Sequence, residues 1–209
     1  GNVTRSTAGT VAQTPGSWSS AANAISFIQG TASGTTGIWV LPMEGERKPR
    51  LFLESRFSLS HAEFSPDGRL MAYVSAESGN PEVYVQSYPD PGERTQVSAA
   101  GGFEPIWSSN GRELFYRNNN TTGTQQYFSA AIRSLSPFRV DAPRLLFEAR
   151  LGHTYLSTGP MRSWDVSPDG TRFFLGRVRE STDKPVTTMQ VVLNWGEELK
   201  RLVPSKGSP

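Results

Sequence analysis

A short motif of an apolar residue, a serine and a turn recurs along this chain and constrains its fold more than any other feature. The second and fourth copies contain Ser-Pro-Asp-Gly, the third contains Ser-Ser-Asn-Gly, and the first keeps only its tryptophan and serine. Successive copies are 46, 43 and 59 residues apart, measured between Ser19, Ser65, Ser108 and Ser167. Strand-rich repeats of about 40–50 residues are typical of propeller blades. The sequence therefore predicts a β-propeller.

The second copy shows the pattern of one blade most clearly. An inner strand ends at Phe64, and a tight turn follows in which Pro66 presets φ and Gly68 accepts a positive φ. Short apolar runs, separated by turn residues, predict three further strands at residues 70–74, 83–85 and 95–97.

Applied to the whole chain, this pattern predicts an all-β fold of four four-stranded antiparallel blades over residues 15–203, followed by a tail at 204–209. Trp195, Leu199 and Leu202 have helical spacing, which predicts a short C-terminal helix. Four blades either close into a small ring, or form part of a larger ring, or are completed by a second chain. Open blade edges are templates for pairing, so we expect self-association, or closure by a strand from residues 1–14.

Composition excludes several classes of function. The chain has no cysteine, which removes disulfides, thiolate metal sites and thiol nucleophiles. Its 21 basic and 19 acidic residues are scattered, whereas a nucleic-acid site would need a one-sided basic stripe, so no nucleic-acid partner is expected. No apolar stretch approaches the roughly 20 residues that span a bilayer.

Several runs in the chain point to a known family. Residues 62–75 read AEFSPDGRLMAYVS and residues 104–116 read EPIWSSNGRELFY, and both resemble the propeller repeats of TolB and its relatives. The ending VVLNWGEELK at residues 191–200 resembles the last blade of TolB-like propellers found behind bacterial serine/threonine kinase domains. This resemblance implies a propeller that binds a protein, a peptide or a small molecule, and a periplasmic or extracellular location.

Acidic residues and a histidine recur on the predicted inner strands. Residues two apart in a strand share a face, so His61 and Glu63 should point the same way, together with Glu104 and Asp165 from other blades. If that face lines the central channel, three carboxylates meet there and need protons or a cation. Oxygen-rich sites of this kind suit Ca²⁺, which makes Glu63, Glu104 and Asp165 candidate metal ligands.

Two functions follow from these residues. The first is a TolB-like binding or assembly module, in which the polar groups line a water-filled channel. The second is a calcium-dependent hydrolase of the lactonase or esterase kind, similar to the lactonase propellers, in which the ion polarises a carbonyl group and His61 or a carboxylate acts as general base. His153, in the long segment before the last repeat, is a second candidate for a catalytic base. The sequence alone leaves open whether the protein is an enzyme.

Overall fold

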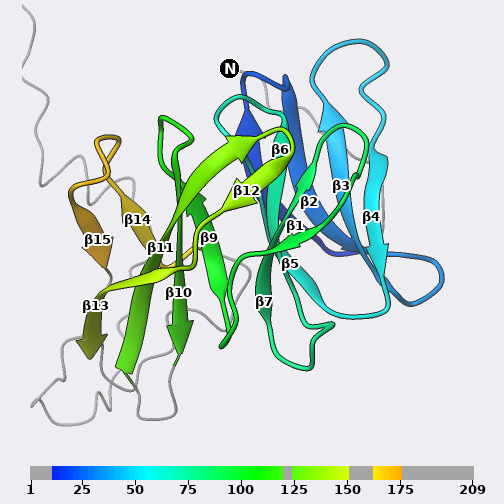
Figure 1. Cartoon of the computed structure of the whole chain (residues 1–209). Coiled ribbons are helices and arrows are strands. Elements are labelled where there is room, and N and C mark those ends of the chain that lie inside the picture. Colours follow the sequence, from blue (N-terminus) through cyan, green and yellow to red (C-terminus); the bar gives the residue numbers. More distant parts are fainter. Residues whose placement is uncertain (1–10, 120–123, 151–161, 176–209) are drawn as a thin grey trace, which may run out of the picture. The chain divides into compact units, whose positions relative to one another are not determined.

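A computed structural model describes residues 11–119, 124–150 and 162–175. All of them belong to one compact unit. The described residues form strands, turns and loops and contain no helix, so none of them forms a helix that could cross a membrane (Figure 1). The helix predicted near residues 195–202 lies outside the described residues.

The first two repeats each form a four-stranded antiparallel sheet in sequential order, as the spacing predicts. The first sheet contains β1 (Gln13–Ser19), β2 (Ala24–Gly30), β3 (Thr36–Pro42) and β4 (Arg50–Ser55). The second contains β5 (Leu59–Phe64), β6 (Leu70–Ser75), β7 (Glu82–Ser87) and β8 (Thr95–Gln96). Residues 13 and 14 belong to β1 and pair with β2.

The third sheet contains one strand more than the pattern predicts. Its strands β9 (Phe103–Trp107), β10 (Glu113–Asn119), β11 (Thr124–Leu135) and β13 (Arg144–Arg150) correspond to one blade. The long β11 also pairs with β12 (Phe138–Val140). The fourth repeat is described only over β14 (Trp164–Val166) and β15 (Phe173–Leu175), which pair with each other.

Neighbouring sheets share apolar clusters, which form the core. Side chains of the first and second sheets meet in one cluster, which includes Ile38, Phe52, Met71 and Tyr73. A second cluster joins the second and third sheets, and a third joins the third and fourth. Each sheet thus buries apolar side chains against the sheet that follows it, which is how propeller blades are stabilised.

The turn between the first two strands follows the repeat as well. In the second sheet, the Ser65 hydroxyl donates to the Asp67 carboxylate (2.6 Å), and that carboxylate accepts from the Arg69 main-chain nitrogen (3.1 Å). Ser108 with Asn110 and Ser167 with Asp169 repeat this arrangement. These hydrogen bonds explain why serine, a short polar residue and glycine recur together.

Candidate functional site

A pocket of about 400 Å³ lies where the inner strands of three sheets come together. Its volume is within the range of about 300–1,000 Å³ that is usual for ligand sites. Residues from β1, β5 and β9 and one residue from the segment before β14 line it: Gln13, Thr14, Pro15, Gly16, His61, Glu63, Glu104, Pro105 and Arg162.

Each of the three inner strands has a bulge at this pocket. The pairing register shifts between Pro15 and Trp18 in β1, between Ser60 and Glu63 in β5, and opposite Phe115 and Arg117 in β9. His61 and Glu104, which lie in two of these bulges, both have a φ of 51°. A positive φ is uncommon for residues other than glycine and is found preferentially at functional sites. The bulges turn toward the pocket side chains that would point elsewhere on a regular strand.

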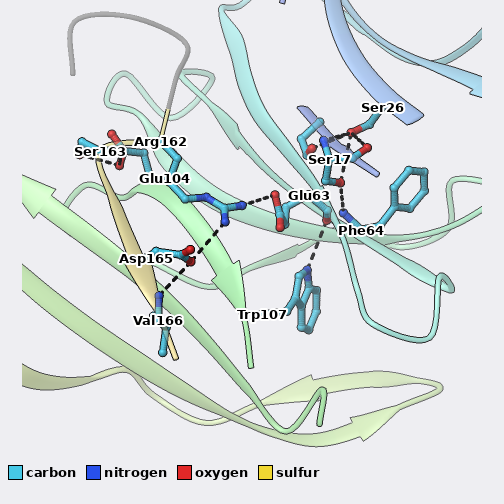
Figure 2. Close-up of polar contacts among 11 residues, drawn as sticks. Ser17, Ser26, Glu63, Phe64, Glu104, Trp107, Arg162, Ser163, Asp165 and Val166 are labelled. Atoms are coloured by element: carbon cyan, nitrogen blue, oxygen red, sulfur yellow. Dashed lines mark hydrogen bonds and ion pairs between the residues drawn. The ribbon is translucent and has the colours of Figure 1, made fainter. Parts of the chain in front are cut away.

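Contacts between sheets fix the first two bulges. The Ser26 hydroxyl donates to the main-chain oxygen of Ala62 (2.7 Å), and the Phe64 main-chain nitrogen donates to the Ser17 hydroxyl (2.8 Å) (Figure 2). A Cβ atom on Gly16 would lie 2.4 Å from the same Ala62 oxygen, so only glycine fits there. The close approach of β1 and β5 therefore depends on residues of both repeats.

An ion pair that bridges distant parts of the chain lies at the edge of the pocket. Arg162 donates to the Glu63 carboxylate at 2.6 Å, and its second terminal nitrogen is 3.6 Å from the carboxylate of Asp165 (Figure 2). Burial raises the pKa of Glu63, and the Arg162 guanidinium opposes this by stabilising the ionised form. Arg162 thus holds two acidic side chains from different sheets.

Glu104 is buried on the other side of the pocket, together with its own cation. Arg117 donates to one carboxylate oxygen at 2.6 Å, and the main-chain nitrogen and hydroxyl of Ser163 donate to the other at 2.9 and 2.8 Å. The side chains of both charged residues are at most 1% exposed. Burial alone would raise the pKa of Glu104, but the Arg117 hydrogen bond and charge, with the Ser163 bonds, lower it.

His61 is the pocket residue with an unused hydrogen-bonding atom. Its Nδ1 lies 2.9 Å from the Ser60 hydroxyl, whereas its buried Nε2 has no hydrogen-bond partner among the described residues. Burial lowers the pKa of His61, and the charges of Arg117 and Arg162 lower it further against the opposing effect of Glu104. The lowered pKa favours the neutral imidazole, whose Nε2 retains the capacity for one hydrogen bond.

The structure brings together three of the five residues singled out from the sequence. His61, Glu63 and Glu104 line one pocket, as the inner-strand argument predicts. Asp165 is not among the lining residues, and its side chain is 64% exposed and reaches the site only through Arg162. His153 lies outside the described residues. Within residues 11–119, 124–150 and 162–175, no group of three or more acidic or histidine side chains is placed to hold a metal ion.

The sequence argument missed the two arginines. It assigned the charge of the carboxylates to a metal, whereas Arg162 and Arg117 neutralise Glu63 and Glu104 in the structure. The sequence contained a signal for Arg162. His61 and Glu104 occupy equivalent positions of the second and third repeats, and Arg162 comes directly before the equivalent position of the fourth repeat. The arrangement offers a ligand the pocket walls and the Glu63–Arg162 ion pair that lies among them.

Sequential antiparallel sheets that bury one face after another, with a pocket at their inner strands, define this protein as a chain of β-propeller blades. Sequence comparison agrees with the family resemblance. The chain is 40% identical over 81 residues to the Tol-Pal system protein TolB of Hahella chejuensis, and 43% identical over 51 residues to the protein of the same name from Pseudomonas aeruginosa. The chain is TolB-like in its repeats and in its fold.

The extent of these matches is limited. They cover 37% and 24% of this chain, but only 18% and 12% of the two TolB proteins. The crystal structure of TolB from Acinetobacter baumannii superposes with a TM-score of 0.59 at 17% identity, over 83% of this chain and 39% of that one. No protein-family model matches the chain. The structural likeness concerns the fold.

Proposed function

We propose that this chain is a TolB-like propeller module that binds a protein partner, and that the pocket at the inner strands receives a peptide segment of that partner. The observation that carries the proposal is a cavity of about 400 Å³ whose lining includes His61 and Glu104, two residues that strand bulges hold at a positive φ. Holding His61 and Glu104 at a positive φ costs of order 1–3 kcal/mol each, and such strain is typical of functional positions.

The relatives support an assembly role over a catalytic one. Both are named as proteins of the Tol-Pal system, and a protein of such a system works together with other components. We also propose a periplasmic or extracellular location, which the resemblance implies. The Ser60 hydroxyl lies 2.9 Å from Nδ1 of His61, but Ser60 is not among the residues that line the pocket.

The proposal can be tested with peptides selected from a random display library on the immobilised protein. We expect selected peptides to lose at least about tenfold in affinity, measured by isothermal titration calorimetry, in the His61→Asn and Glu63→Gln variants, since tenfold is the effect of one hydrogen bond of about 1.4 kcal/mol. Asparagine tolerates a positive φ, so His61→Asn removes the imidazole without disturbing the bulge.

Asn23→Gly is the matched control. Asn23 has a φ of 47° in the turn after β1 but does not line the pocket, so this variant relaxes a similar backbone strain at a distance. It should bind the selected peptides as the original protein does. If no peptide is enriched, or if binding ignores both pocket variants, the pocket is not a peptide site.

A further inference from the structure

One wall of the pocket already binds a guanidinium group. Arg162 places one terminal nitrogen 2.6 Å from the Glu63 carboxylate and the other 3.6 Å from the Asp165 carboxylate, so two acidic side chains share one cation (Figure 2). Glu63 and Arg162 both line the pocket, and their side chains are 19% and 34% exposed. A ligand in the pocket can therefore reach both members of the pair.

The Glu63 carboxylate has room for a second donor. Arg162 donates to its Oε2 atom, and among the described residues no donor is placed on its Oε1 atom. Each oxygen of an ionised carboxylate can accept more than one hydrogen bond, and bonds from a cationic donor are the strongest. Glu63 is thus suited to bind a cation that a ligand brings.

Glu104, the other acidic residue of the lining, is not available in this way. Arg117 donates to one of its oxygens, and Ser163 donates twice to the other. Its side chain is also fully buried. A ligand that contacts a carboxylate of the pocket therefore contacts Glu63.

The charged side chains around the pocket leave an excess of negative charge. His61 does not offset it, because the lowered pKa of its imidazole favours the neutral form. Among the described residues, three carboxylates are matched by two guanidinium groups: Glu63, Glu104 and Asp165 against Arg117 and Arg162. A basic ligand would cancel this excess, whereas an acidic ligand would add to it.

We propose, on the basis of the function proposed above, that the pocket selects a lysine or an arginine of the bound peptide segment. The cation of this side chain binds the Glu63 carboxylate, and Arg162 remains paired with Asp165. Asp165 thus provides a partner for the arginine of the protein while the ligand occupies Glu63. No charge is left unpaired in the exchange, which would otherwise be costly in a largely buried site.

The first test uses the peptides that are selected on the immobilised protein. We expect them to share a lysine or an arginine at one position, although the formal net charge of +2 on the chain would favour acidic peptides by non-specific attraction. Acetylation of that lysine, or citrulline in place of that arginine, should weaken binding about tenfold or more in isothermal titration calorimetry. The same change should have little further effect on binding to Glu63→Gln, because the partner of the cation is already absent.

Arg162→Gln gives the second test. Because Arg162 competes with the ligand for Glu63, this variant should bind the basic peptides about tenfold more tightly. Arg133→Gln is the matched control. It removes the same charge from an exposed ion pair with Asp141, outside the pocket lining, and should leave the affinity unchanged.

The outcomes separate this proposal from the function on which it rests. Peptides that need the pocket residues but share no basic side chain would overturn the proposed specificity and leave the peptide site in place. So would basic peptides that bind more weakly to Arg162→Gln, since Arg162 would then be a ligand contact and not a competitor. If no peptide is enriched, the peptide site itself fails, and the specificity fails with it.

Discussion

Glu104 is the residue on which most of the buried polar network depends. It accepts three hydrogen bonds, one from Arg117 in its own sheet and two from Ser163 beside the fourth sheet. Arg117 in turn lies over the ring of Phe103, with its guanidinium carbon 5.5 Å from the ring centre. A buried charge is stable only while its partners remain, so the loss of any one member of this network should destabilise the protein.

We predict that Arg117→Met destabilises the protein by about 3–5 kcal/mol, because it leaves the Glu104 carboxylate buried without its cation. The double variant Glu104→Gln/Arg117→Met should recover part of this loss, since neither charge then remains. Urea denaturation of the two single variants and the double variant measures the coupling between them. Additive effects would contradict the pairing, because residues in contact should not behave independently.

The contribution of Glu104 to the stability of the protein should depend on pH. The pKa of Glu104 is lowered below its ordinary value of 4.5, so its contribution to stability is present above pH 4.5 and is lost as the pH falls through the lower folded value. The difference in unfolding free energy between the original protein and Glu104→Gln should therefore shrink in acid. A difference that stays constant through this range would show that the ionised carboxylate is not the stabilising form.

One of the turns that recur in the repeats also contacts the neighbouring sheet. Gly68 and Gly111 occupy the same position in their turns and have φ values of 70° and 68°. A Cβ atom on Gly68 would lie 2.6 Å from the main-chain nitrogen of Ala22 in the first sheet, whereas one on Gly111 would meet nothing closer than 3.9 Å. The two glycines thus share a backbone conformation and differ in their tertiary surroundings.

We predict that Gly111→Ala costs about 1–2 kcal/mol, which is the penalty for a side chain in the left-handed region. Gly68→Ala should cost at least about 1 kcal/mol more, because it also forces the second-repeat turn away from the backbone of the first sheet. Thermal and urea unfolding of the two variants supplies the comparison. Equal losses would mean that the turn moves freely and does not hold the two sheets together.

The elements show which features the sequence predicts and which it does not. The strands of the first three sheets follow from alternating apolar residues and repeated turns, because these signals are local. The bulges at His61 and Glu104 have no local signal, since neither residue type requires a positive φ. The ion pair between Glu63 and Arg162 joins residues 99 positions apart and depends on how the sheets stack. Sequence reasoning therefore brings Glu63 and Glu104 to one pocket, but it does not place Asp165 there and does not find the cations.

At the scale of the whole molecule, repetition places one inner strand of each sheet beside the next. His61, Glu63 and Glu104 meet at a single pocket for this reason, although they come from two repeats. The guanidinium groups of Arg162 and Arg117 lie where a cation is needed. A Ca²⁺ ion at the predicted site would thus compete with two arginine side chains for the same carboxylates, and the proposed hydrolase depends on that ion.

We predict that Ca²⁺ and EDTA leave the melting temperature of the original protein unchanged, because Glu63 and Glu104 already have cationic partners. A bound ion at one hundred times its dissociation constant would add about 2.7 kcal/mol, which scanning calorimetry detects easily as a shift of several degrees. In the Arg162→Gln variant, Glu63 and Asp165 lose their cation, and Ca²⁺ should then raise the melting temperature. Calcium stabilisation of the original protein, abolished by Glu63→Gln, would instead support the metal site and the hydrolase that depends on it.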